Sequence, residues 1–396
     1  MVRSAKRAAQ LFLAGVAIAT ATAATAQTMA PASAEQAQLA WTVEAANDLK
    51  QAIEASRGEG LNPTDYGPER LAAAIASGPS LSLDAVAGAA AQALAHDYAF
   101  GRVADREAMD WYISGGSDPG VLVRGLGQAI AAGKPRAFIE SLLPTDPRYV
   151  ALRSALAEAP DQASRDRLRA NMERWRWMPR QLGQDYLYVN VPTYQLKVVS
   201  GGQMLSTYTV IVGAKDTPTP QLASPASSLV VNPWWYVPQS IVKSSNLRPG
   251  RGGYVFKANA DGSMSVRQPP GPRNSLGRIK INLINDHAIY LHDTPARGAF
   301  ARDDRALSHG CIRVKDIDQL AAELIDAGSN DGRFETALAG TETETVPLGK
   351  TWQVYLVYFT ADTDDSGQLV TFGDPYGRDA ALIAKLNGGS VQMAAR

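Results

Sequence analysis

The only cysteine of the chain and three of its four histidines lie within one stretch of 25 residues. Cys311 directly follows the sequence Ser-His-Gly. A thiol with an ordinary pKa of about 8.5 needs a nearby imidazole or positive charge to become a nucleophile at neutral pH. Glycine lets the backbone approach a substrate closely, so the amides of Gly310 and Cys311 could face a developing oxyanion. The pattern predicts a cysteine nucleophile.

Among the three nearby histidines, His292 is the predicted proton acceptor and donor. It ends a predicted strand, on a segment separate from Cys311 that can face the thiol. His309 is only two residues from Cys311 and is predicted to support the site locally. His287 precedes His292 by five residues, and in an unbroken strand this separation places it on the opposite face. We therefore expect His287 to be a structural partner.

A metal site is the main rival to a cysteine nucleophile. His287, His292, Asp293, His309 and Cys311 all carry ligand atoms that a metal hydrolase could use. The chain lacks the H-E-x-x-H pattern of helical zinc sites. One cysteine can supply neither a multi-thiolate zinc site nor an intrachain disulfide. We expect no metal and no other cofactor, and activity that survives a strong chelator would dismiss the rival.

The elements that must position these residues fall into two halves with different periodicity. Residues 39–177 keep the helical spacing of apolar side chains, and Pro179 ends the last helix. From about residue 183 the pattern alternates, and Gly201-Gly202 indicates a hairpin. We predict an α+β chain, with a helical scaffold domain over 39–177 and a β-rich catalytic domain over 178–360.

Two further segments belong to the second half. Residues 238–275, rich in Gly, Pro, Ser and Arg, predict an irregular insertion that caps the substrate groove. Residues 361–396 are predicted to be a C-terminal extension. A helix is expected over 316–327, between an aspartate and Gly328. The expected strands are 186–191, 194–199, 204–212, 229–232, 278–283, 288–292, 352–359 and 368–372.

The first 26 residues have the layout of a secretory signal peptide. Arg3, Lys6 and Arg7 precede a short apolar stretch, and Ala24-Thr25-Ala26 offers the small residues of a cleavage site. We expect cleavage after Ala26, a linker over 27–38 and export of the mature chain, with an uncleaved membrane anchor as the alternative. No later stretch is apolar for long enough to cross a membrane. With 39 basic and 39 acidic residues, the chain lacks the basic excess typical of nucleic-acid binding.

Two motifs give the chain a family resemblance. His292-Asp293-Thr294 and the run from Ser308 to Arg313, Ser-His-Gly-Cys-Ile-Arg, resemble the signature of the L,D-transpeptidases of bacterial cell walls. Residues 171–179, 232–238 and 267–272 support the resemblance. Together they are similar to the large periplasmic type, which has an N-terminal scaffold domain and a capping insertion on its catalytic domain.

The resemblance implies acyl transfer through a thioester at Cys311. The thiolate would attack the carbonyl between the third residue of a tetrapeptide stem and its terminal D-alanine, while His292 takes the thiol proton or holds it as an ion pair. Asp293 would orient His292, through its backbone carbonyl rather than its carboxylate. Arg313 would bind a substrate carboxylate or form a structural salt bridge. The candidate substrate-binding residues are Arg313, Ser308 and Tyr290.

The implied partners are peptidoglycan stem peptides in the periplasm: a tetrapeptide donor and a diaminopimelate amine as acceptor. Other cell-wall enzymes are further candidate partners. Transfer would cross-link the third residues of two stems. With water or a D-amino acid as acceptor, the same site would act as an L,D-carboxypeptidase or as an exchange enzyme. A catalytically silent wall-binding scaffold is the alternative from another class. The resemblance also implies that carbapenems acylate Cys311.

Overall fold

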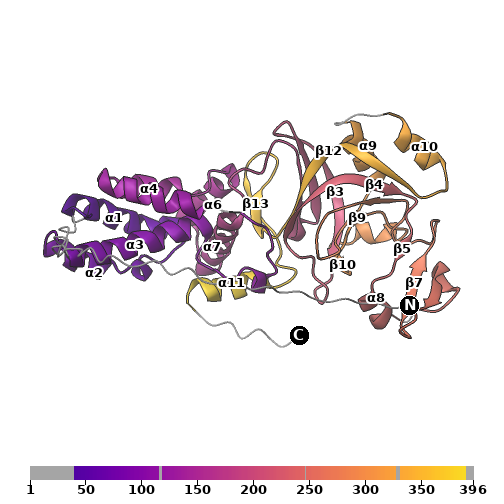
Figure 1. Ribbon diagram of the computed structural model, residues 1–396, viewed down its shortest axis with the longest axis horizontal. Coiled ribbons are helices and arrows are strands. Elements are labelled where there is room, and N and C mark those ends of the chain that lie inside the picture. The colour runs from indigo at the N-terminus through magenta and orange to yellow at the C-terminus, as the bar shows by residue number, and fades with distance from the viewer. Residues whose placement is uncertain (1–39, 116–117, 246, 327–330, 389–396) are drawn as a thin grey trace, which may run out of the picture. The chain divides into compact units, whose positions relative to one another are not determined.

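The computed structural model describes residues 40–115, 118–245, 247–326 and 331–388 (Figure 1). The predicted signal peptide and linker lie outside these residues. Among the helices in the described ranges, none is both long and apolar enough to cross a membrane.

The first half is helical, as its periodicity predicts. Short polar residues begin several helices: the side chains of Thr42, Ser80 and Asp118 each accept a hydrogen bond from an amide in the first turn. Pro119 is the first residue of its helix, a position at which the missing N–H of proline costs no helical hydrogen bond. The helices are α1 (Val43–Ala55), α2 (Pro68–Ala76), α3 (Leu81–Phe100), α4 (Pro119–Ala131), α5 (Pro135–Ser141), α6 (Pro147–Glu158) and α7 (Gln162–Trp177), with short 3-10 turns η1 (Ser56–Glu59), η2 (Pro63–Tyr66) and η3 (Glu107–Met109).

The second half contains a nine-stranded sheet that returns on itself. Its strand order is β10-β3-β11-β9-β8-β4-β12-β1-β2, and β2 also pairs with β3. This closure removes most of the free strand edges. The strands are β1 (Tyr186–Asn190), β2 (Gln195–Ser200), β3 (Gln203–Gly213), β4 (Leu222–Val231), β8 (Ile279–Ile281), β9 (Leu291–His292), β10 (Ala306–Ser308), β11 (Ile312–Val314) and β12 (Glu344–Val357). The helices α9 (Ile317–Asp326) and α10 (Arg333–Ala339) pack on β12.

The strand predicted over 288–292 is shorter in the structure. Ala288 has a left-handed backbone conformation with a φ of 55°, which strand residues do not adopt. Only Leu291 and His292 remain in β9. The residues before them form a turn in which the side chain of Asn285 accepts hydrogen bonds from the amides of His287 and Ile289. The alternation argument for His287 therefore does not apply.

The insertion over 238–275, together with residues 234–237 directly before it, forms a small cap with more regular structure than the sequence predicts. Three short strands, β5 (Trp235–Tyr236), β7 (Met264–Gln268) and β6 (Val255–Ala258), form an antiparallel sheet in the order β5-β7-β6. The helix α8 (Gln239–Ser244) and the 3-10 turn η5 (Arg251–Gly253) complete the cap (Figure 1).

The C-terminal segment packs on the helical half instead of extending from the catalytic half. The strands β13 (Ala361–Thr363) and β14 (Leu369–Thr371) form a hairpin, and α11 (Arg378–Leu386) contacts α7. Leu382 and Leu386 belong to the same buried core as the helices. Arg174 of α7 forms an ion pair with Asp379 of α11 at 2.6 Å. The described part of the predicted extension thus completes the helical core.

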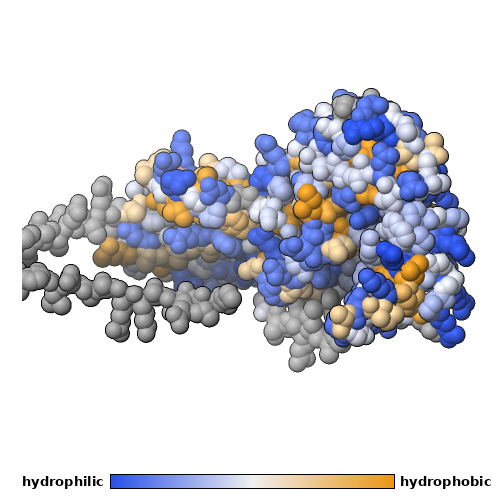
Figure 2. Space-filling view, turned by 45° about the vertical axis from the view of Figure 1, so that its right-hand side comes forward, coloured by the Kyte–Doolittle hydropathy of each residue, from blue (hydrophilic) through white to orange (hydrophobic). Residues whose placement is uncertain are grey.

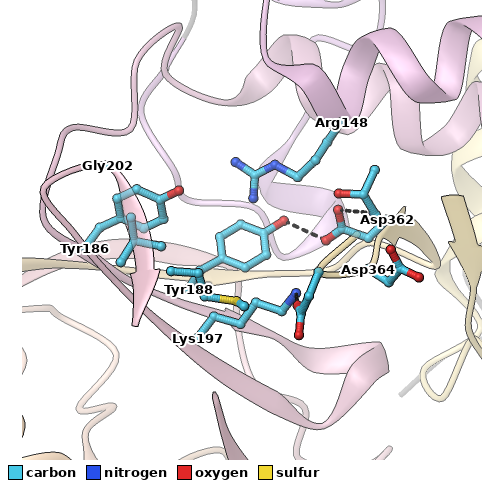
Figure 3. Close-up of a pocket in the computed structure, with 11 residues that line it drawn as sticks. Arg148, Tyr186, Tyr188, Lys197, Gly202, Asp362 and Asp364 are labelled. Carbon is cyan, nitrogen blue, oxygen red and sulfur yellow. Dashed lines mark hydrogen bonds and ion pairs between the residues drawn. The ribbon is translucent and has the colours of Figure 1, made fainter. Parts of the chain in front are cut away.

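A cavity of about 240 Å³ lies where α6, β1, β2 and β13 meet (Figure 3). The Arg148 guanidinium lies 4.8 Å from the ring centre of Tyr188, whose hydroxyl donates to Asp362 at 3.2 Å. Burial raises the pKa of Asp362. None of the candidate site residues lines this cavity. Its aromatic and charged side chains join the helical and the β-rich halves.

Candidate active site

A second cavity, of about 510 Å³, holds most of the predicted site. The cap supplies part of its wall through residues such as Trp235, Ile241 and Tyr254. Six candidate residues also line it, and they are Tyr290, His292, Ser308, His309, Cys311 and Arg313. Gly310 and Asp293 do not line it.

Two neighbouring parallel strands place the thiol and the imidazole together. Leu291 of β9 is paired with Ile312 of β11, and His292 is paired with Arg313. Cys311 comes directly before β11, two residues from the partner of His292. Diagonal neighbours at this separation lie on one face of a sheet, within reach of each other's side chains. The structure therefore brings Cys311 and His292 to the same cavity.

His292 is oriented by a backbone carbonyl. Its side chain is buried, with 5% of the residue exposed, and its Nδ1 lies 2.5 Å from the carbonyl oxygen of Asp293. A carbonyl oxygen can only accept, so Nδ1 carries the hydrogen and Nε2 carries the lone pair. Burial and the positive charge of Arg313 lower the pKa of His292 to about 3. The imidazole is neutral at neutral pH and can accept a proton at Nε2.

The carboxylate of Asp293 has a different task from its carbonyl. It accepts a hydrogen bond from the amide of Arg278 at 2.9 Å and forms an ion pair with Arg297 at 3.2 Å. Gly277 has a positive φ, and a Cβ atom there would overlap this carboxylate. The carboxylate thus fixes the neighbouring turns, while the carbonyl holds the histidine.

The turn before Cys311 is closed by the hydroxyl of Ser308. This hydroxyl donates to the carbonyl of Cys311 at 2.6 Å and accepts from the amide of Gly310 at 3.1 Å. Gly310 has a φ of 109°, and its carbonyl accepts from the hydroxyl of Thr219 at 2.7 Å. Ser308 lines the cavity, but its hydroxyl is used inside the turn.

This turn corrects the expectation that the Gly310 amide faces an oxyanion. That amide is already bonded to Ser308. For the amide of Cys311 we find no acceptor within the described part of the chain. Oxyanion support from the backbone would therefore come from Cys311 itself.

The thiol of Cys311 is neutral in this environment. Burial raises its pKa, although the amide and hydroxyl of Tyr290 and the positive charges of Lys280 and Arg313 act in the opposite direction. The thiol donates a hydrogen bond to the carbonyl oxygen of Ala288, with Sγ 3.6 Å from that oxygen. Thiol and imidazole are thus both neutral, which favours proton transfer to His292 during attack over a preformed ion pair. Such catalytic hydrogen bonds often form only when substrate is bound.

Two positive charges flank the imidazole. Lys280 of β8 and Arg313 of β11 are both directly paired with His292, so the three side chains lie in one row on the same face. Burial lowers the pKa of both cations, and no carboxylate near enough to raise either pKa is found in the described residues. Arg313 Nε is buried without a hydrogen-bond partner among those residues. The structural salt bridge considered for Arg313 is not formed there, which leaves a ligand carboxylate as its expected partner.

Sequence reasoning missed Tyr112 and Lys280. Tyr112 belongs to the helical half, and its ring centre lies 4.2 Å from that of His287 at the edge of the cavity. Its amide donates to the carbonyl of Gln221 at 2.7 Å, which fixes this segment on the second half. His287 lines the same cavity as His292, so its predicted place on the opposite face is wrong. Nothing in the sequence around Tyr112 indicates this contact.

The metal-site rival is not supported by the positions of its proposed ligands. Within the described ranges, no three His, Cys, Asp or Glu side chains come together as a metal site. Nδ1 of His292 is bonded to a carbonyl and the Asp293 carboxylate to two donors. His309 is exposed at the edge of the cavity.

Comparisons with known proteins give a match in each half of the chain. Residues 184–334 match the model of the L,D-transpeptidase catalytic domain, and residues 33–156 match that of the scaffold domain. A Haemophilus influenzae protein assigned to the L,D-transpeptidases is 34% identical over 227 residues, which cover 51% of this chain and 46% of that protein. The chain thus matches about half of the length of this relative.

Two solved structures are also similar to the chain. L,D-transpeptidase 1 of Mycobacterium tuberculosis matches 44% of this chain and 61% of its own, with 13% identity and a TM-score of 0.23. An L,D-transpeptidase of Mycobacterium smegmatis matches 44% and 58%, with 12% identity and a TM-score of 0.25. On the sequence matches, residues 184–334 belong to the L,D-transpeptidase catalytic domain family and follow a domain of the scaffold family.

Proposed function

We propose that this protein cross-links peptidoglycan by joining the third residues of two stem peptides through a thioester at Cys311. The observation that carries the proposal is the neutral His292, held at Nδ1 by the Asp293 carbonyl, in one cavity with the thiol. The family to which residues 184–334 belong is a class of cysteine-dependent acyltransferases that act on peptidoglycan.

In the proposed reaction, the thiol first turns from the Ala288 carbonyl toward Nε2 of His292. Sγ then attacks the carbonyl between the third residue and the terminal D-alanine of the donor, while Nε2 accepts the thiol proton. The C–N bond breaks, and the proton on Nε2 passes to the departing D-alanine amine. The amine of a second stem attacks the thioester, loses a proton to His292, and forms the new C–N bond as the C–S bond breaks and the thiol is restored.

Arg313 is proposed to hold the terminal carboxylate of the donor. It lines the cavity with Cys311, its half-buried guanidinium has no carboxylate partner in the described residues, and its buried Nε has no hydrogen-bond partner there. Guanidinium binds carboxylates in a planar, bidentate geometry. A bound carboxylate would offset the positive charge that lowers the pKa of His292 and so strengthen the base. Donor recognition and base strength would thereby be linked.

The test is to incubate the protein, without residues 1–26, with purified tetrapeptide-bearing wall fragments and to follow the products by mass. The proposal expects a cross-linked dimer that has lost one D-alanine. Loss of D-alanine without a dimer would identify an L,D-carboxypeptidase, and incorporation of an added D-amino acid would identify the exchange enzyme. No change in the mass of the wall fragments would favour the catalytically silent wall-binding scaffold.

A carbapenem gives a second readout of the same thiol. We propose that its strained lactam carbonyl imitates the donor carbonyl and acylates Cys311. Because the chain has one cysteine, intact mass should show one adduct, absent in Cys311→Ala. A native protein that stays unmodified in excess carbapenem and converts no wall fragment would refute the proposed function.

We further propose that the protein is exported to the periplasm. The support is the basic, apolar and small-residue pattern of residues 1–26. Expression of the full chain in a bacterial cell should give a periplasmic product that begins at Gln27, as determined by N-terminal sequencing.

A further inference from the structure

The cap carries a strong excess of positive charge. Residues 238–275 contain six basic residues and one acidic residue, a net charge of +5 in a chain whose total is zero. The remainder of the chain therefore carries −5. All six basic side chains are exposed, and they are Lys243, Arg248, Arg251, Lys257, Arg267 and Arg273.

The charges of the cap are not neutralised locally. The one acidic residue, Asp261, accepts hydrogen bonds from the amide and hydroxyl of Ser263. In the described part of the chain, the closest recorded partner of Arg267 is the face of Trp234, 4.6 Å from the guanidinium to the ring centre. A cation over an aromatic ring keeps its full charge for an outside ligand.

The cap sheet has two unlike faces. Trp235 and Gln268 are paired on the inner face, where Trp235 lines the cavity with Cys311 and Gln268 is buried. The outer face carries the row Tyr236–Arg267–Val255, in which Arg267 is paired with both neighbours.

The outer row is open to solvent. Tyr236 is 69% exposed and Val255 is 43% exposed. Lys257 lies two residues beyond Val255 on the same face. Figure 2 shows hydrophobic and hydrophilic side chains side by side at the lower right, in the region of the cap.

We propose that this outer face, defined by Trp234, Tyr236, Val255, Lys257 and Arg267, binds the anionic wall polymer next to the stem that enters the cavity. Exposed basic side chains attract a polymer with many carboxylates, and the stem peptides of the wall carry them. The exposed aromatic ring and the guanidinium offer apolar and polar contact to the same polymer. The proposal rests on the proposed function, because it takes the wall as the substrate.

The outer face and the catalytic cavity lie on opposite sides of one small sheet. A polymer held on the outer face would keep neighbouring stems near Cys311, while a short soluble fragment would occupy only the cavity. The two kinds of substrate should therefore respond differently to changes on the outer face.

The test compares Lys257→Glu/Arg267→Glu with Arg124→Glu/Lys134→Glu, a control that changes the net charge equally on exposed positions of the helical half. Both pairs are made in Cys311→Ala, so that binding is measured without turnover. Cosedimentation with purified insoluble wall at about 0.1 M salt should show binding weakened about tenfold in the cap variant alone. The difference should shrink as salt is raised. Tyr236→Ser, which leaves the charge unchanged, should weaken binding at all salt concentrations.

Kinetics with soluble tetrapeptide fragments, measured with Cys311 intact, separate this inference from the proposed function. The cap variant should convert fragments within about twofold of the unchanged protein. Unchanged wall binding in the cap variant, or an equal loss in the control, would overturn the inference. Cap-dependent binding to vesicles of anionic phospholipid, equal to that to wall, would assign the face to a membrane and also overturn it. Cap-dependent wall binding by a protein that converts no fragments would overturn only the proposed function.

Discussion

The depressed pKa of His292 makes a prediction about stability that does not depend on the reaction. The folded protein keeps this imidazole neutral down to about pH 3, whereas the unfolded chain protonates it near pH 6.5. Between these values the unfolded state binds one more proton than the folded state. The contribution of His292 to the free energy of unfolding is therefore fully present above pH 6.5 and is lost as the pH is lowered. From pH 7 to pH 5 the loss due to His292 is about 2 kcal/mol.

His292→Gln removes the titrating group and keeps a side-chain N–H for the Asp293 carbonyl. The assay is urea unfolding of both proteins at pH 7 and pH 5. The unchanged protein should lose about 2 kcal/mol more free energy of unfolding than the variant, because all other titrating groups are shared. His309→Gln is the matched control, because it removes an exposed histidine at the same cavity. Equal losses in the unchanged protein and His292→Gln would refute the burial argument.

Three further predictions concern the reaction. Cys311→Ala should abolish cross-linking of tetrapeptide fragments. His292→Ala should lower it about as far, because a nucleophile and its base act as a unit. An inactive His309→Ala together with an active His292→Ala would show that the base is assigned wrongly. Arg313→Gln should raise KM about tenfold or more for a donor with a free terminal carboxylate. It should leave KM unchanged for a donor that is amidated at that end. An equal effect on both donors would contradict carboxylate binding. Tyr112→Ala should lower kcat about threefold to tenfold, since the ring contact with His287 supports the turn whose carbonyl holds the thiol. Loss of global stability in Tyr112→Ala would instead indicate a structural role.

The sequence was sufficient for the parts of the fold that depend on local pattern. The helical first half, the strands β1 to β3 and the position of Cys311 beside His292 follow from periodicity and spacing. The long strands β4 and β12 begin seven and eight residues before the strands predicted over 229–232 and 352–359. The strand over 288–292 could not be corrected from the sequence, because alanine rarely adopts the left-handed conformation that Ala288 has. The strands β10 and β11 have three residues each, too few to show an alternation.

The details of the site depend on tertiary contacts that no local pattern encodes. The glycine at position 310 suggests a backbone amide that is free to bind an oxyanion. The hydroxyl of Ser308, two residues earlier, already accepts a hydrogen bond from that amide. Tyr112 reaches His287 only because the helical half packs on the strands. The packing of α11 against α7 likewise depends on Leu382 and Leu386 meeting helices far away in the sequence. The sequence predicts a C-terminal extension over 361–396, whereas Leu382 and Leu386 are buried in the helical core.

The hydrogen bond from the thiol to the Ala288 carbonyl has a consequence for chemical durability. Peroxide and other oxidants attack thiolates much faster than thiols, and the first product, sulfenic acid, cannot act as the nucleophile. Cys311 is held as a thiol beside a neutral imidazole until a donor arrives, so the unoccupied enzyme should resist peroxide. Lys280→Met would remove a positive charge that favours the thiolate, and a donor carboxylate on Arg313 would offset the other one, so each should slow peroxide inactivation further. Mass spectrometry after a peroxide pulse measures the oxidised fraction of Cys311 in the unchanged protein, in Lys280→Met, and in the unchanged protein with an unreactive donor analogue. Equal oxidation in the three samples would contradict the reasoning. The single reactive sulfur of the protein would then be protected from oxidation until proton transfer to His292 begins the attack.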